Sequence, residues 1–203
     1  MYINNTTYFH KNFTVDDAKR LLNEIDCGDE HSRNRIKNEI SIHLQKRIGE
    51  NYFKPIELLC EKTDQDCNVG FITMGLLCIL IELLYEMKNG KDESRVYDAY
   101  KTVLPTVDTL FTEQLIKKFY RGVRCGIVHQ GQTKANTAIS FETDKVMVYM
   151  DKLYLFNPWI LYDELLIVYD NYWKSVEKDD YTNHDISFKM VSKYRHILNN
   201  ISM

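Results

Sequence analysis

Residues 69–87 read VGFITMGLLCILIELLYEM and form the most hydrophobic stretch of the chain. The uncharged run that includes most of them, residues 67–81, is about 15 residues long, short of the roughly 18 that a membrane span requires. We therefore expect no membrane segment. The stretch is predicted to form the central buried helix of the fold.

Glu82 stands between two hydrophobic residues of this stretch and, at helical spacing, shares a stripe with Cys78 and Ile79. An unpaired carboxylate in such surroundings costs several kcal/mol. Two alternatives follow. Either Glu82 lies at the rim of the helix and reaches water, or it bonds to Arg121 or Arg124.

Hydrophobic residues recur at helical spacing on both sides of the central helix. Thr14 opens a sequence typical of a capping box, and Asn157–Pro158 offers a cap and a first turn to a later helix. Residues 1–13 receive no assignment. The other predicted helices cover residues 15–25, 31–48, 54–62, 95–104, 113–130, 159–176 and 186–197.

Several residues predict where these helices begin or end. Gly28 is expected to close the first helix, and the second is expected to end at Ile48. After Gly49, Pro55 takes the favoured first-turn position of a brief third helix. Ser94 is expected to cap a helix that Pro105 ends.

After Gly131 the hydrophobic period changes from near four to two, with a short Asp151–Lys152 turn between two runs. This pattern predicts a small antiparallel hairpin or meander. The fold class is therefore mainly α. We expect one helical domain over residues 1–203, a bundle with a small β-hairpin after the helix at 113–130.

Composition narrows the possible functions. A net charge of -3 argues against a generic nucleic-acid coat, so contact with phosphates needs a local basic patch. The five cysteines form no CxxC pair, which favours reduced thiols in the cytoplasm, and no signal peptide is evident. No glycine-rich phosphate loop, HExxH or GxSxG occurs, so neither a metal nor a cofactor is predicted.

Residues 119–133, FYRGVRCGIVHQGQT, carry the strongest functional signal. Thr112 is the expected N-cap of their helix and Gly131 its terminator. Gly122 and Gly126, four apart, predict that something packs closely there. At about 100° per residue the predicted core side holds Ile116, Phe119, Tyr120, Val123 and Ile127, and the opposite side holds Lys117, Lys118, Arg121, Arg124, Cys125 and Val128.

His129 follows Arg124 at about 140° around the helix and about 7.5 Å along it. A simple interpretation is a surface helix whose cations complement its C-terminal dipole. The alternative is chemistry on RNA, since histidine can move the 2′-OH proton and arginine can stabilise the phosphate without a metal. One copy lacks a second acid or base. An isologous dimer through this helix, with the two glycines allowing close approach, would bring two Arg124 and two His129 into one cleft.

The segment Arg124-Cys-Gly-Ile-Val-His129, an arginine followed by four residues and a histidine, resembles the signature of the HEPN superfamily. The preceding apolar helix with an acidic residue, GLLCILIELLYE, is similar to uncharacterised bacterial HEPN-like proteins, and the resemblance covers about residues 55–173. It implies a helical bundle that dimerises through the motif helices. Active members are metal-independent endoribonucleases that leave a 2′,3′-cyclic phosphate and serve in toxin–antitoxin pairs or phage defence.

The resemblance assigns the motif positions to Arg124 and His129, and more loosely a polar position beside the motif to Glu82. Arg121, Lys117, Lys118 and Lys134 would then guide the RNA backbone. The position after the motif arginine is Cys125, where many active members carry Asn, Asp or His. Two other hypotheses stay open: a module that binds a nucleotide or a partner protein without chemistry, and a purely structural helical domain.

Overall fold

The computed structural model describes residues 2–3, 6–61, 69–90, 95–181 and 185–201, and it is mainly helical, as predicted. The chain divides into two compact units. The first comprises Met1–Pro55, Glu86–Glu93 and Asn171–Met203, and the second comprises Ile56–Tyr85 and Ser94–Asp170. The predicted HEPN-like core, about 55–173, covers nearly the same residues as the second unit. The predicted cap at Ser94 lies outside the described residues.

The first unit begins with a three-stranded antiparallel sheet that the sequence did not predict. Its strands are β1 (Tyr2–Ile3), β2 (Thr6–His10) and β3 (Phe13–Thr14), in the order β1-β2-β3. The strands are two to five residues long, too short for a period of two to be visible. The helices of this unit are α1 (Val15–Cys27), α2 (Glu30–Ile48), the π-helix η1 (Gly49–Phe53) and α9 (Ile186–Ile201).

The predicted capping box at Thr14 is confirmed. Its hydroxyl accepts from the Asp17 amide at 3.0 Å, and the Asp17 carboxylate accepts from the Thr14 amide at 3.2 Å. Gly28 follows the end of α1, also as predicted.

The predicted end of the second helix at Ile48 matches the end of α2, but no break in the helix follows it. Gly49 has helical φ and ψ of -57° and -48°, and α2 continues through η1 into α3 (Lys54–Glu61). Pro55 lacks an amide hydrogen and its ring crowds the carbonyl four residues earlier. The wider π-turn just before it, in which the Lys54 amide donates to the Gly49 carbonyl, accommodates the proline without ending the helix.

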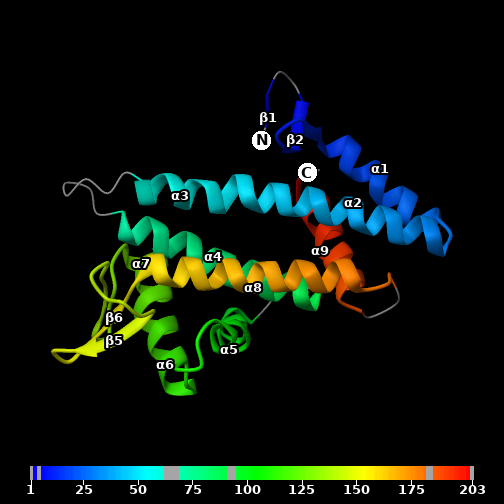
Figure 1. The fold of residues 1–203 in the computed structure, drawn as a ribbon. Helices are drawn as coiled ribbons and strands as arrows, with labels where there is room; N and C mark the ends of the chain where they lie inside the picture. Colours follow the sequence, from blue (N-terminus) through cyan, green and yellow to red (C-terminus); the bar gives the residue numbers. More distant parts are fainter. Residues whose placement is uncertain (1, 4–5, 62–68, 91–94, 182–184, 202–203) are drawn as a thin grey trace. The chain divides into compact units, whose positions relative to one another are not determined.

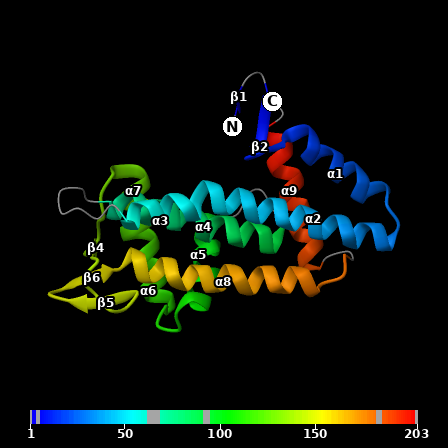
Figure 2. The same cartoon turned by 45° about the horizontal axis from the view of Figure 1, so that its top comes forward.

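The second unit contains the central hydrophobic helix, α4 (Gly70–Asn89), and the motif helix. Met74, Leu77, Leu80, Ile81 and Leu84 of α4 are fully buried, which confirms its predicted place in the core. The α4 and α8 portions within this unit lie side by side in both views (Figures 1 and 2), and the Tyr169 hydroxyl donates to the Leu80 carbonyl at 2.9 Å. The further elements are α5 (Val96–Val107), α6 (Glu113–Lys118), the π-helix η2 (Phe119–Arg124), α7 (Cys125–Gln130), β4 (Thr137–Ile139), β5 (Met147–Met150), β6 (Leu153–Phe156) and α8 (Pro158–Lys178).

Within the part of the chain that the structure describes, α4 is the single helix long and apolar enough to cross a membrane. Half of its most apolar window is buried inside the protein, and the core helix of a soluble protein meets the same criterion. A soluble protein is consistent with this finding.

The predicted hairpin is β5 and β6, which pair antiparallel through a tight turn at Asp151 and Lys152, both with positive φ. The prediction of an all-antiparallel meander is wrong for β4. The strand order is β4-β6-β5, with β4 parallel to β6, because the chain passes from one edge of the sheet to the other before it enters β5.

Pro105 does not end α5 as predicted. The helix continues to Val107, and the Asp108 amide still donates to the Leu104 carbonyl at 3.1 Å. Asn157, in contrast, caps α8 as predicted, since its side-chain oxygen accepts from the Trp159 amide at 2.9 Å.

Candidate functional site

The motif helix runs without interruption from α6 through η2 to α7. The Thr112 hydroxyl caps its start by accepting from the Leu115 amide, and Gly131 ends it with a φ of 66°, so both predicted boundaries are confirmed. Its middle turn is π, with the Cys125 amide donating to the Tyr120 carbonyl. Such a turn within an α-helix often marks a functional site.

The π-turn changes which side chains face the core. Phe119 and Val123 are fully buried, as predicted. Tyr120 and Ile127, predicted for the core, are half-buried, and Arg124, predicted for the opposite side, is drawn toward α4. A constant 100° per residue fails here because the wider turn changes the rotation between the residues before and after it.

Glu82 of α4 pairs with Arg124, which confirms one of the two predicted alternatives. The Arg124 Nε donates to Glu82 Oε1 at 3.0 Å, and a terminal nitrogen lies 3.5 Å from Oε2. The two side chains are 16% and 21% exposed. The hydroxyl of buried Tyr100, on α5, donates to the same Oε1 at 2.8 Å. Three helices therefore fix the orientation of the guanidinium.

The ionisation of this group follows from burial and pairing. Burial disfavours the charge on Arg124, but the hydrogen bonds and attraction of Glu82 outweigh it and raise the pKa of Arg124. Burial raises the pKa of Tyr100 well above its ordinary value, so it is a permanent donor. Burial also raises the pKa of the Cys78 thiol to about 12, which keeps it protonated.

His129 is exposed near the end of α7. The structure does not bring it to Arg124 within one chain, since the five intervening steps along the helix leave the two residues on different sides. No hydrogen bond or ion pair between them occurs among the described residues.

The predicted close packing at Gly122 and Gly126 is confirmed, but the chain's own loop occupies the space. A Cβ at Gly122 would lie 2.5 Å from a Thr137 side-chain carbon, and one at Gly126 would lie 2.4 Å from the Gln132 carbonyl oxygen. The Lys134 amide also donates to the Gly122 carbonyl at 2.9 Å. The expectation that these glycines admit a second motif helix is therefore wrong.

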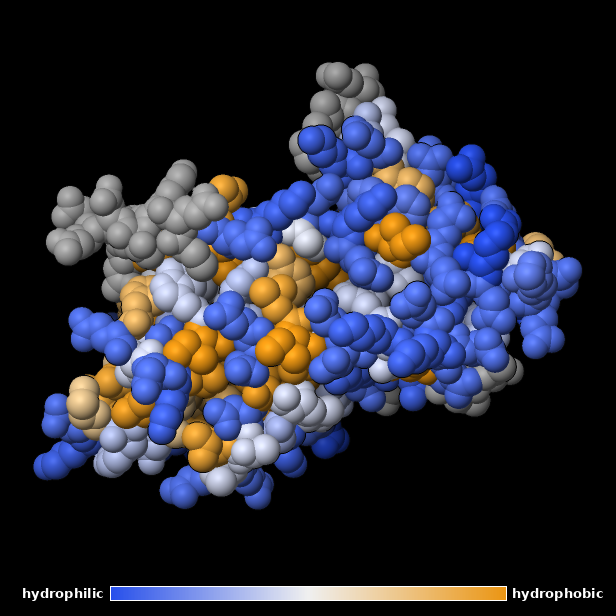
Figure 3. All heavy atoms as spheres, viewed as in Figure 1, coloured by the Kyte–Doolittle hydropathy of each residue, from blue (hydrophilic) through white to orange (hydrophobic). Residues whose placement is uncertain are grey.

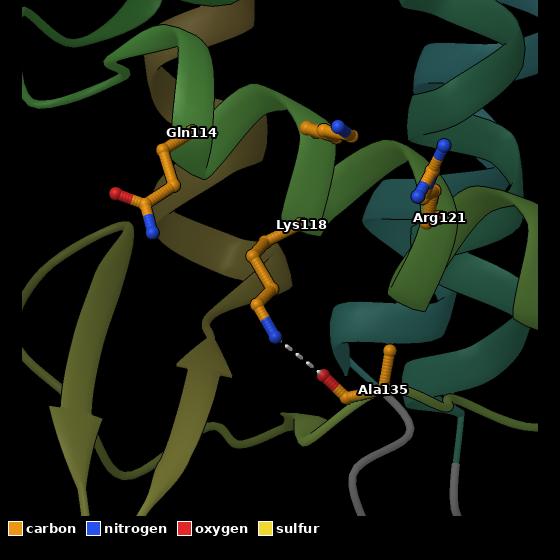
Figure 4. A pocket seen from close by; sticks show the side chains of 5 residues that line it. Gln114, Lys118, Arg121 and Ala135 are labelled. Atoms are coloured by element: carbon orange, nitrogen blue, oxygen red, sulfur yellow. Dashed lines mark hydrogen bonds between the residues drawn. The ribbon is translucent and has the colours of Figure 1, made fainter.

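Two pockets lie along the cationic side of the motif helix. The first, which we call the lysine pocket, has a volume of about 320 Å³ and is lined by Gln114, Lys117, Lys118, Arg121 and Ala135 (Figure 4). There the Lys118 ammonium donates to the Ala135 carbonyl at 3.2 Å. Three of the four predicted RNA-guiding cations are thus brought together, whereas Lys134 is not among the residues that line this pocket.

The second, which we call the tyrosine pocket, has a volume of about 230 Å³ and is lined by Tyr97, Glu113, Lys117, Tyr120 and Arg121. Sequence reasoning missed its aromatic and acidic members. Tyr97 comes from another helix, and Tyr120 was placed in the core. The spacing of four between Glu113, Lys117 and Arg121 was a usable signal that they share a face.

Within the described ranges, no group of three or more His, Cys, Asp or Glu residues could hold a metal ion. Comparison with protein-family models, with curated proteins and with solved structures finds no match.

Proposed function

We propose that this protein is a metal-independent endoribonuclease that acts as a homodimer, with Arg124 and His129 of two copies forming one composite site. The observation that carries the proposal is the Arg124 guanidinium, which is held by Glu82, itself bonded to Tyr100. Arg121, three residues earlier on the same helix, lines both cationic pockets. The resemblance of the Arg124–His129 segment to the HEPN signature supports the same assignment.

Arg124 has the properties that phosphate stabilisation requires. Its charge is permanent, and Glu82 occupies one edge of the guanidinium, which leaves the remaining N–H groups for a ligand. A charged donor that is oriented in advance stabilises the negative charge that builds on phosphate oxygens in the transition state. Glu82 is a positioning residue in this account.

His129 provides the proton transfer. Its imidazole takes the proton of the RNA 2′-OH while the 2′-oxygen bonds to the adjacent phosphorus and the bond to the 5′-oxygen breaks. The partner's His129 gives a proton to that leaving oxygen. The products are a 2′,3′-cyclic phosphate and a free 5′-OH, and the RNA itself supplies the nucleophile.

Exposed hydrophobic residues near the motif support a dimer. Ile72 and Ile79 of α4 and Val128 of α7 are 58%, 45% and 54% exposed. The two helices touch, because a Cβ at Gly75 would lie 3.8 Å from an Ile127 methyl group. Ile72 and Ile79 lie within about 60° of Gly75 around α4. A second copy that covers this area would bury hydrophobic surface and approach His129.

The test is cleavage of mixed single-stranded and structured RNA by purified protein in EDTA. Wild type should cleave, whereas His129→Ala should lose at least about a hundredfold in rate, the lower range for a general acid or base. Arg124→Lys keeps the charge but loses the planar donor fork and should also be impaired. Cleavage that survives in His129→Ala would remove the proposal.

Two observations favour a second candidate, a module that binds a nucleotide or a protein without chemistry. Glu82 neutralises Arg124, and Cys125 occupies a position where active HEPN members often carry a polar residue. Tight nucleotide binding without RNA turnover would select this function. The first proposal includes a cytoplasmic role as a toxin or phage-defence effector, with an antitoxin encoded by a neighbouring gene. The identity of that gene tests this role.

A further inference from the structure

The tyrosine pocket has a shape and chemistry that phosphate binding alone does not explain. Its volume of about 230 Å³ is below the roughly 300 Å³ at which sites for drug-sized ligands begin, which suits a single planar base. Two of its five lining residues are aromatic, and it shares Lys117 and Arg121 with the lysine pocket.

The aromatic wall is held in place. The Tyr120 ring lies 5.1 Å from the Tyr97 ring and 5.4 Å from the Tyr100 ring, centroid to centroid, and tilted by 58° in both pairs. Tyr100 in turn donates to Glu82. The pocket wall is thus connected to the Arg124 pair. A base that stacks on the face of a tyrosine ring gains affinity in the way that single-stranded RNA does elsewhere.

Glu113 is the acidic residue among those that line the pocket. An ionised carboxylate only accepts hydrogen bonds, and its two oxygens suit a ligand edge with two neighbouring donors. Among the four RNA bases, guanine presents that edge, with N1–H beside the N2 amino group. Adenine and cytosine place a ring acceptor next to their amino donor, and uracil places carbonyls on both sides of its single donor.

We propose that the tyrosine pocket binds a guanine base of RNA, with Glu113 accepting from N1–H and the N2 amino group, and that the attached phosphate lies against Lys117, Arg121 and Lys118. This inference deepens the proposed function, since it names the base next to the site of cleavage. Glu113 is a specificity-determining residue, and Lys117 and Arg121 join the base to its phosphate because they line both pockets.

The test is isothermal titration calorimetry of the full-length protein with guanosine, adenosine and inosine 3′-monophosphates. Guanosine monophosphate should bind at least about tenfold more tightly than adenosine monophosphate, as expected for charge-assisted hydrogen bonds. Inosine monophosphate, which lacks the amino group, should lie between them. Glu113→Gln should remove most of the guanine preference, and the control Glu142→Gln, an exposed glutamate that lines neither pocket, should keep it.

Three results would overturn the inference. Equal affinity for guanosine and adenosine monophosphates, or no binding of either, would remove the guanine pocket, as would a preference that persists in Glu113→Gln. The measurement does not depend on turnover. Guanine-selective binding by a protein that cleaves no RNA would therefore support the guanine pocket and contradict the proposed ribonuclease function. Cleavage without guanine preference would support the ribonuclease function and contradict the guanine pocket.

Discussion

The Glu82–Arg124 ion pair has a structural role and a proposed functional role. The side chains are mostly buried, so each needs the other's charge, and the same contact aims the guanidinium. Glu82→Gln should lower the free energy of unfolding by about 1–3 kcal/mol, because it leaves a largely buried charge without its counter-ion. Chemical denaturation measures this loss.

The matched control is Glu24→Gln, which removes the exposed pairing between Arg20 and Glu24, where the side chains are 67% and 43% exposed. It should change stability by less than about 0.5 kcal/mol. A double-mutant cycle of Glu82→Gln with Arg124→Met gives the coupling energy. A coupling near zero would contradict the role of Glu82 as the partner that holds Arg124.

From the sequence, Glu82 either reached water at the rim of its helix or bonded to Arg121 or Arg124. Burial of a carboxylate requires a partner, but helical spacing does not choose it. The sequence could not predict that Tyr100 joins the pair or that Tyr97 lines a pocket. Both tyrosines belong to α5, and local sequence patterns do not determine how α5 packs against the motif helix.

Among the secondary-structure elements, the short strand β2 is attached to α2 by a pair of histidines. His10 Nε2 and His43 Nδ1 lie 2.8 Å apart, and the Phe13 ring stacks on His43 with 3.5 Å between centroids. One imidazole donates and the other accepts, so the contact requires that at least one stays neutral. Protonation of both would place two N–H groups face to face.

This contact predicts a pH dependence of stability. Burial, the neighbouring His10 and Lys46 lower the pKa of His43 to about 4, against a weaker opposing effect of Asp17. Burial likewise lowers the pKa of His10, although its hydrogen bond to the Lys11 carbonyl and the charge of Glu50 oppose this effect. Lys46 and Arg47 act in the same sense as burial. An unfolded histidine titrates near 6.5.

Between pH 6.5 and about 4 the unfolded chain therefore binds more protons than the folded one, and stability falls as the pH is lowered through this window. Hydrogen exchange at a series of pH values should show that the β2 amides lose protection, relative to the α1 amides, as the pH is lowered. His43→Leu should reduce that pH dependence, leaving the part that His10 contributes. An unchanged pH profile in this variant would assign the effect to other groups.

The helices were predictable because their signals are local: hydrophobic periodicity together with caps at Thr14, Thr112 and Asn157 and a terminator at Gly131. The predictions failed where a residue distant in the sequence, or a local change of helix type, determines the structure. A π-turn accommodates Pro55 and keeps a helix intact past Gly49. The parallel pairing of β4 with β6 is decided by where the loop crosses the sheet.

For the whole molecule, the central question is whether two copies associate through the motif helix. Figure 3 shows that exposed hydrophobic side chains gather over the region of α8 and the hairpin of the second unit, so more than one surface of this unit could attract a partner. Val128, beside His129, is 54% exposed, and Ile167, on α8, is 55% exposed. Ile167 therefore serves as a matched control position for Val128.

Val128→Glu should shift the protein from dimer to monomer in sedimentation velocity and lower RNA cleavage in parallel, because a buried unpaired charge opposes association. Ile167→Glu should leave both unchanged. If Ile167→Glu breaks the dimer and Val128→Glu does not, the interface lies elsewhere and the composite Arg124–His129 site is excluded.

The most direct measurement is the chemical identity of the ends that the protein leaves on RNA in EDTA. The account predicts 2′,3′-cyclic phosphate and 5′-OH ends from wild type, absent with His129→Ala, because the 2′-oxygen is the nucleophile and the histidine moves its proton. Ends with a 3′-OH and a 5′-phosphate, or cleavage that requires an added divalent metal, would contradict it.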